Sequence, residues 1–435
     1  MNPCVSKHLG KANTVGDNCY CYLLIVIEIF NLKGIRNKQN RRDWFMKNLV
    51  YTNEDFTEEI KQAQFYVTHP NKLLEKVKEE IKQKKIDTPI HNPYPNPYTH
   101  KLTYYKGFLK NSNRLSNYLK AISAQNNTER DFYPFILDIE PNRTCNFHCV
   151  MCLHGQNKVS KADNMTYEDF VTFMQENDYI MEVKLHGLGE PLLVEGYEKM
   201  MQYLVDNHIW SRMVTNGSLL HINDIYKSLV DMSVGEIQCS FDGTNPEMLE
   251  KIRKGSKWDN VFNNFKKLNK YSNKQNKLIT RMWTVIQKEN RNNLMDFVEV
   301  AAMMEFRRLS VGFVQTDWGN ETLKNKIKTI TPELIRDDEK YEMIDRGKIY
   351  DIEVTFWNQL NSYSKNKLCP WVFQRPYISA EWKIVPCCII GDPEVINFGN
   401  AYNLKKIWIS KAYKEFRQMH ISGNIPEYCR SCYEH

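Results

Sequence analysis

Hydrophobic and polar positions divide the chain into three regions. Apolar residues recur at helical spacing between about 54 and 84, within a Lys- and Asn-rich region that extends to residue 130. The three prolines of HNPYPNPYTH at 91–100 predict an extended connector. We therefore predict an N-terminal region at 1–130 that is mostly helical and whose role the pattern does not indicate.

From residue 131 to about 330, short apolar runs alternate with helical patterns such as WDNVFNNFKKLNKY. Strand–helix alternation repeated about six times predicts an α/β fold with a parallel sheet and right-handed crossovers. Functional residues should then follow the strands, at the carboxyl-end mouth of an open or closed barrel. The six predicted strands lie at 135–140, 181–189, 211–217, 235–243, 279–287 and 309–315.

Composition indicates a globular protein with several cores. The chain has 435 residues, of which 42% are hydrophobic and 26% charged. A net charge of +7 is mild at this length, and Asn and Gln dilute the basic stretches, so we predict no nucleic-acid partner. The apolar run at 19–30 contains Glu28 and is too short for a bilayer, which predicts no membrane segment. Met46 offers an alternative initiator.

Nine of the twelve cysteines lie at or beyond Cys145, and seven of these fall in two clusters with metal-ligand spacing. Disulfide frameworks belong to small secreted domains, so this placement favours thiolates held for metal in a reducing cytoplasm. The first cluster, Cys145, Cys149 and Cys152, follows the first predicted strand. Three cysteines in one tight loop can ligate three irons of a cubane and leave the fourth iron open, as in a catalytic site. The alternative is a zinc site completed by His148 or His154.

The spacing Cys145-x3-Cys149-x2-Cys152 resembles the radical S-adenosylmethionine (radical SAM) superfamily. The resemblance implies a partial (β/α)6 TIM-like barrel at 131–330 and a SAM molecule on the open iron. Met151 then occupies the apolar position that packs beside the adenine.

Motifs after three further strands extend this resemblance. Gly187-Leu188-Gly189-Glu190 is similar to the family's GGE motif, although Leu188 replaces a glycine. Small residues there allow close approach to a ligand, and a carboxylate can accept a hydrogen bond from the SAM ammonium. The resemblance implies further cofactor contacts after the third and fourth strands, from Asn216, Ser240, Asp242 and Arg253.

A second cysteine cluster lies in the C-terminal region at 331–435, after a predicted linker. A hairpin centred on EWK can bring Cys387 back to Cys369, and Cys429-x2-Cys432 completes four thiolates. This resembles the twitch domain, the shortened SPASM domain, and implies one auxiliary 4Fe–4S cluster. Cys388 is an alternative ligand to Cys387, and tetracysteine zinc is an alternative to the cluster.

The resemblance implies reductive cleavage of SAM to a 5′-deoxyadenosyl radical that abstracts a substrate hydrogen. A fully ligated second cluster favours net oxidation, so we predict a dehydrogenation or bond formation on a small polar molecule such as a sugar or cyclitol. The alternatives are a peptide or protein side chain as substrate, or a zinc-stabilised protein without catalysis. An external electron donor such as flavodoxin or ferredoxin is implied. Candidate catalytic groups are Asp317, Arg375 and Glu381.

Overall fold

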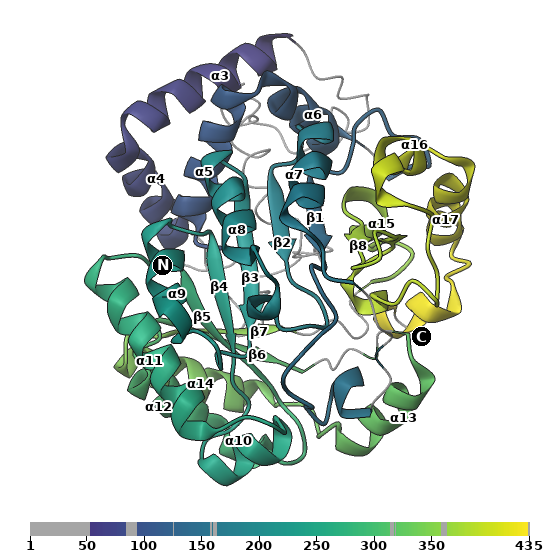
Figure 1. Cartoon of the computed structure of the whole chain (residues 1–435). Coiled ribbons are helices and arrows are strands. Elements are labelled where there is room, and N and C mark those ends of the chain that lie inside the picture. The colour runs from purple at the N-terminus through teal and green to yellow at the C-terminus, as the bar shows by residue number, and fades with distance from the viewer. Residues whose placement is uncertain are drawn as a thin grey trace, which may run out of the picture.

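The computed structural model describes residues 53–83, 94–124, 126–156, 159, 163–313, 317, 319–357 and 363–433 (Figure 1). The apolar run at 19–30 and Met46 lie outside these residues. Within the described ranges, no helix is both long and apolar enough to cross a membrane.

A nine-stranded sheet with the order β7-β6-β5-β4-β3-β2-β1-β8-β9 forms the centre of the molecule. Every pair from β1 to β7 is parallel and sequential, and the sheet stays open because β1 pairs with β8 rather than β7. The first six strands follow the predicted runs, which confirms the partial α/β barrel. The seven parallel strands are β1 (Ile136–Ile139), β2 (Glu182–Leu185), β3 (Trp210–Thr215), β4 (Glu236–Ser240), β5 (Thr280–Val285), β6 (Arg308–Gly312) and β7 (Glu353–Trp357).

Strand β7 is a departure from the predicted pattern. It pairs with β6 over five residues, from Arg308↔Glu353 to Gly312↔Trp357, so the sheet continues past residue 330. Val354 and Phe356 bury its apolar face, whereas the sequence analysis placed a linker in this part of the chain.

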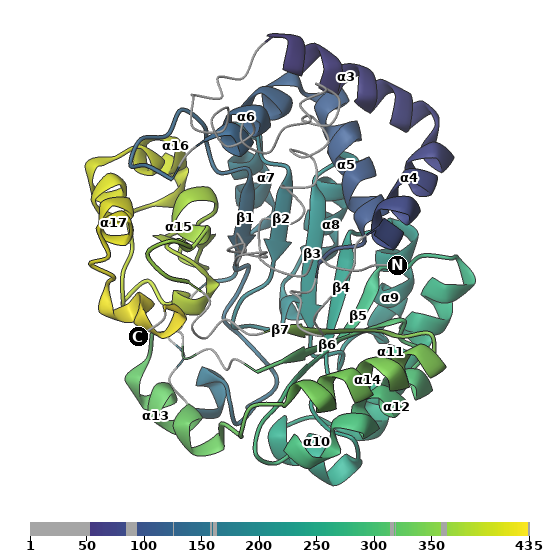
Figure 2. The same ribbon diagram turned by 180° about the vertical axis from the view of Figure 1, so that it is seen from behind.

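Helices follow the strands and cover the outer face of the sheet (Figures 1 and 2). Local sequence fixes several of their starts: the Thr166 hydroxyl accepts from Asp169 N, and the Asn245 side chain accepts from Met248 N ahead of Pro246. The helices of this region are α7 (Tyr167–Glu176), α8 (Tyr197–Asp206), α9 (Ile225–Asp231), α10 (Pro246–Ile252), α11 (Trp258–Lys274), α12 (Leu294–Met303), α13 (Glu321–Ile330) and α14 (Asp337–Ile349). Short 3-10 turns are η2 (Leu153–Gln156), η3 (Pro191–Leu193), η4 (Ile222–Asp224) and η5 (Arg291–Asn293).

The described N-terminal residues are helical, as predicted. The helical pattern at 54–84 is interrupted at Pro70, which begins a new helix because proline is favoured in a first helical turn. The four helices are α3 (Asn53–Thr68), α4 (Pro70–Gln83), α5 (Pro97–Lys110) and α6 (Ser112–Ser123).

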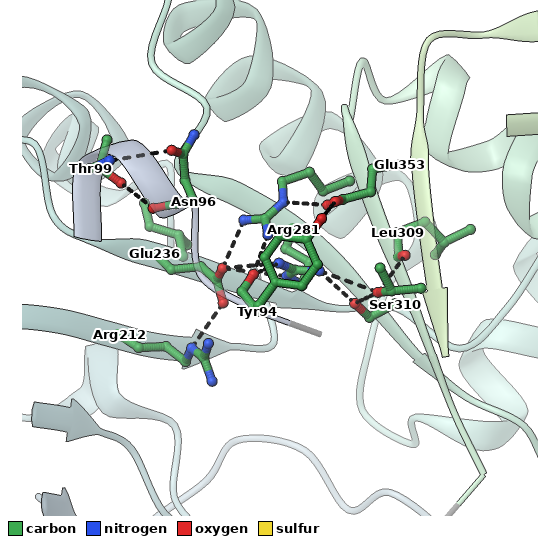
Figure 3. Close-up of polar contacts among 12 residues, drawn as sticks. Tyr94, Asn96, Thr99, Arg212, Glu236, Arg281, Leu309, Ser310 and Glu353 are labelled. Carbon is green, nitrogen blue, oxygen red and sulfur yellow. Dashed lines mark hydrogen bonds and ion pairs between the residues drawn. The ribbon is translucent and has the colours of Figure 1, made fainter. Parts of the chain in front are cut away.

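Tyr94, in the segment before α5, contacts residues at the amino-terminal ends of β6 and β7 (Figure 3). Its hydroxyl donates to Glu353 Oε1 at 2.7 Å, and its carbonyl oxygen accepts from Arg281 at 2.5 Å and from Arg308. Both arginines also pair with Glu236 at the start of β4. This end of the sheet is therefore filled by a polar network, and the opposite end is left for the strand-end loops.

The C-terminal unit packs at the β1 edge of the sheet (Figure 1). Its hairpin, β8 (Tyr377–Ile378) and β9 (Ile384–Val385), turns around EWK as predicted, and β8 pairs in parallel with β1. The auxiliary cysteines are thereby attached to the strand that leads into the first cysteine loop. The remaining elements are α15 (Trp371–Gln374), η6 (Cys388–Ile390), η7 (Ala401–Asn403), α16 (Leu404–Trp408), α17 (Lys411–Ser422) and η8 (Glu427–Cys432).

Candidate functional site

The cysteine loop begins six residues after β1 and is held by backbone hydrogen bonds from two sides. His148 N donates to Lys254 O at 2.7 Å, and Val150 N donates to Ile252 O at 2.9 Å, which ties the loop to the end of α10. On the other side Glu190 N donates to Thr144 O at 2.8 Å. The loop is therefore fixed between the segments that follow β2 and β4.

The three thiols of this loop lie in a low-dielectric environment that contains hydrogen-bond donors. Burial raises the pKa of Cys145 to about 11 and that of Cys149 to about 12, although the nearby Arg253 guanidinium opposes the rise at Cys149. The Cys145 sulfur accepts from Phe147 N at 3.5 Å and from Asn216 Nδ2 at 3.9 Å. Thiols of this kind become thiolates when a metal binds, so the donor set suits an iron–sulfur cluster.

No three His, Cys, Asp or Glu side chains in the described ranges are placed to hold a single metal ion. A cubane 4Fe–4S cluster does not need three side chains directed at one metal ion, because each thiolate binds a different iron.

Gly187 and Gly189 allow the segment after β2 to pack directly on the end of β1. A Cβ at Gly187 would lie 2.3 Å from Glu140 Cγ, and one at Gly189 would lie 2.3 Å from Asn142 Oδ1. Leu188 N donates to Glu140 Oε1 at 3.0 Å across the same contact. In the structure, the glycines are thus required by protein packing, a reason that differs from the ligand approach argued from the sequence.

Glu190 links three strand-end segments. Its carboxylate accepts from Thr215 Oγ1 and Asn216 N, each at 2.7 Å, and from Leu192 N at 3.3 Å. Burial raises the pKa of Glu190 to about 7. Since Asn216 also donates to Cys145, the predicted site residues after β1, β2 and β3 form one hydrogen-bonded group.

The residues after β4 lie next to the same loop. Arg253 Nη2 pairs with Asp242 Oδ2 at 2.7 Å, and both side chains are buried. Asp242 Oδ1 also accepts from Val285 N at 2.7 Å, so this carboxylate is occupied by protein contacts. Arg253 is close enough to Cys149 and Cys152 to stabilise their anionic forms. Ser240 ends β4, and Met151 is partly buried against the core.

Four of the C-terminal cysteines influence one another electrostatically. Cys369, Cys387 and Cys432 lie near Cys429 and act with burial to raise the pKa of its thiol. Cys429 and Cys432 are both in η8, and Cys387 precedes η6. The fold thus brings together the four cysteines that the sequence predicts as ligands of the auxiliary cluster.

Cys388 belongs to a different environment. Burial, Asp138 of β1 and the neighbouring Cys387 raise the pKa of its thiol, whereas Arg375 and Lys184 of β2 oppose the rise. The backbone at Cys387 is extended, with φ −166° and ψ 170°, and consecutive side chains of extended chain point to opposite sides. Cys387 therefore faces the other auxiliary cysteines, whereas Cys388 faces the interior of the barrel.

The three candidate catalytic groups do not converge. Asp317 lies close enough to Cys432 to raise the pKa of that thiol and accepts from Gly319 N at 2.9 Å. Glu381 pairs with Arg143 at 3.1 Å. Arg375 faces the barrel interior, where its Cζ lies 3.5 Å from the centroid of Trp371.

Sequence reasoning missed two polar residues that face the barrel interior, Lys184 and His186 of the β2 segment. Their signal is present in MEVKLHGLG, where polar residues alternate with the fully buried Val183 and Leu185. Burial lowers the pKa of His186 to about 4, which keeps its imidazole neutral.

Two family models match the chain. The model described as the radical SAM superfamily matches residues 139–301, and the one described as an iron-sulfur cluster-binding domain, SPASM, matches 369–433. A probable GTP 3′,8-cyclase of Methanocaldococcus jannaschii is 30% identical over 135 residues, which are 30% of this chain and 44% of the cyclase. The match therefore spans less than half the length of that relative.

Solved structures share the fold at low sequence identity. Streptococcus suis SuiB bound to precursor peptide SuiA has a TM-score of 0.51 at 15% identity, covering 85% of this chain and 83% of SuiB. Native anSMEcpe with bound AdoMet has a TM-score of 0.50 at 16% identity, covering 69% and 88%.

Proposed function

We propose that this chain, which belongs to the radical SAM superfamily and carries a SPASM iron–sulfur cluster-binding domain, oxidises a small polar molecule such as a sugar or cyclitol. Its cofactors are a SAM-binding 4Fe–4S cluster, SAM and an auxiliary iron–sulfur cluster. When bound, they supply a 5′-deoxyadenosyl radical and an electron acceptor.

The observation that carries this proposal is the direct connection between the cysteine loop and the other strand-end motifs. Asn216 donates to the Cys145 sulfur at 3.9 Å and to Glu190 Oε2 at 2.7 Å. We assign Cys145, Cys149 and Cys152 to the first cluster. A carboxylate offers about four acceptor positions, and Glu190 uses three, which leaves one for the SAM ammonium.

Four thiolates at Cys369, Cys387, Cys429 and Cys432 would complete the coordination of one auxiliary cluster. A cluster with four protein ligands has no open iron for the substrate, so we assign it to electron transfer and the overall reaction to oxidation. An external one-electron donor such as flavodoxin or ferredoxin then reduces the first cluster. Thiolates held for metal favour the reducing cytoplasm as the location.

A peptide or protein side chain is the second candidate substrate. It is supported by the fold shared with SuiB, which has been crystallised with a precursor peptide. The small molecule is favoured because the described residues at 53–124 form only helices, without the strand hairpin typical of a leader-binding winged helix.

Deuterium transfer tests the proposed function. The reconstituted protein is incubated without oxygen with SAM, a reductant and deuterated candidates, in parallel sets of sugars, cyclitols and peptides. Deuterium in 5′-deoxyadenosine from a sugar or cyclitol, with a product two electrons more oxidised, is the expected result. Deuterium transferred only from a peptide would contradict the small-molecule substrate and identify a peptide as the substrate class. A colourless zinc protein that does not cleave SAM would overturn the proposal.

A further inference from the structure

A row of polar side chains crosses the inner face of the sheet below the cysteine loop. Asp138 of β1, Lys184 of β2 and Arg212 of β3 are register partners, and Tyr377 of β8 pairs with Asp138 on its other side. Register partners on neighbouring strands point to the same face. The adjacent residue Val183 points the other way, into the apolar core under the helices.

Lys184 lies in this row without a polar partner. In the part of the chain that the structure describes, its ammonium forms no hydrogen bond and no ion pair, and its Nζ lies 5.6 Å from the Trp371 ring centroid. Arg375 stacks on the same ring at 3.5 Å. Burial and the nearby Arg375 together lower the pKa of Lys184 to about 8. Two cations are therefore held against one indole ring.

The carboxylates near Lys184 are largely engaged elsewhere. The charged groups near Lys184 are Arg375, Asp138, Arg212 and Glu182, and the titratable side chains of His186 and Cys388 also lie near its ammonium. Glu182 is hydrogen-bonded to an imidazole and a phenol of α5, at 3.1 and 3.2 Å. Arg212 pairs with a carboxylate at the start of β4. Among the described residues, Asp138 is the carboxylate near Lys184 that forms none of these contacts.

Two oxygen atoms in the same row of side chains are buried and have no hydrogen-bond partner among the described residues. They are Asp138 Oδ1 and Tyr377 Oη, on side chains that are 1% and 0% exposed. Buried polar groups in native proteins are nearly always paired, so an unpaired group requires an explanation. Two such groups on the adjacent strands β1 and β8, together with the ammonium of Lys184 on β2, indicate that a polar ligand completes them.

We propose that Lys184 and Arg375 bind an anionic group of the substrate, a carboxylate or a phosphate, inside the barrel. The inference rests on the proposed function, because it takes the ligand to be the molecule that loses hydrogen. The Tyr377 hydroxyl donates to the same anion, and Asp138 accepts from a hydroxyl or amine of the ligand. Lys184 lies on β2 three residues before Gly187, so the rest of the molecule extends toward the strand ends. The substrate class is a polar acid that carries hydrogen-bond donors.

Calorimetric titration of the reconstituted full-length protein with SAM present tests this site without knowledge of the substrate. Sulfate represents a phosphate and acetate represents a carboxylate, at constant chloride and ionic strength. The variants are Lys184→Gln and, as the matched control, Lys199→Gln, whose side chain is exposed on α8. We expect one anion to saturate a single site in the wild type and the control, with at least about tenfold weaker binding in Lys184→Gln. The preferred anion identifies the group.

The pH dependence of sulfate binding gives a second readout that needs no variant. Lys184 loses its proton as the pH rises through about 8, whereas sulfate keeps its charge, so wild-type affinity should fall over this interval. Equal affinity in folded Lys184→Gln, an affinity that does not change with pH, or no saturable binding would overturn the inference. SAM cleavage is measured on the same wild-type sample. Cleavage without anion binding contradicts only this site, whereas anion binding without cleavage contradicts the proposed function.

Discussion

Arg143 and Glu381 form an ion pair across the contact between the barrel and the C-terminal hairpin, with Nη1 3.1 Å from Oε1. The same guanidinium donates to Glu140 Oε2 at 3.0 Å and to Gly391 O at 3.2 Å. Ala380 N also donates to Glu140, at 3.2 Å. Because Arg143 lies two residues before Cys145, this network fixes the first cysteine loop relative to the auxiliary domain.

Arg143→Ala should destabilise the protein much more than Glu381→Ala. Removing the arginine leaves the fully buried Glu140 carboxylate without its cation, which costs about 3–5 kcal/mol. Glu381→Ala removes a carboxylate that is 29% exposed and leaves Arg143 paired with Glu140, so the effect should be about 1 kcal/mol or less. Denaturant midpoints of the two reconstituted variants check this order. Equal midpoints would contradict the assigned role of the network.

Glu190→Ala should weaken SAM binding by about 2–3 kcal/mol while both clusters are retained. The reason is the loss of a buried carboxylate that we assign to the SAM ammonium. Equilibrium binding of SAM and iron content are the two measurements, with Glu195→Ala as an exposed control from the same segment. Unchanged SAM affinity would show that Glu190 serves only to connect Thr215 and Asn216.

Replacement of Cys387 and of Cys388 by serine should have different consequences for bound iron. Cys387→Ser removes a ligand from the auxiliary cysteines, so iron should fall by roughly half if each cluster holds four irons. Cys388→Ser should keep the full iron content, since its thiol faces Asp138 and Lys184 in the barrel. The two variants control for each other in the same iron assay. Equal losses would contradict the opposite orientation of these neighbours.

Local patterns in the sequence were sufficient for much of the fold. The runs at β1 to β6, the hairpin around EWK and the cysteine spacing are all encoded within short segments, which is why periodicity and spacing reveal them. Strand β7 was missed because its apolar residues, Val354 and Phe356, occupy a short stretch after the charged helix α14. Its role as a strand depends on pairing with β6, which is a tertiary contact.

The missed parts of the site depend on register and side-chain direction. Asp138 and Lys184 are 46 positions apart and become neighbours only when β1 pairs with β2. The choice between Cys387 and Cys388 depends on an extended backbone that no spacing rule specifies. The sequence predicts that Gly187 and Gly189 allow close approach to a ligand, whereas the groups packed against them in the structure are Glu140 and Asn142, which a local motif does not reveal.

Production of 5′-deoxyadenosine by a variant with Cys145, Cys149 and Cys152 all replaced by alanine is the most direct test of the radical SAM assignment. Without the three ligands of the first cluster, the variant should lose roughly half of its iron and all SAM cleavage under dithionite. Cys239→Ala, which removes a buried thiol outside both clusters, is the matched control and should keep both. Wild-type yields of 5′-deoxyadenosine from the folded triple variant would contradict the account.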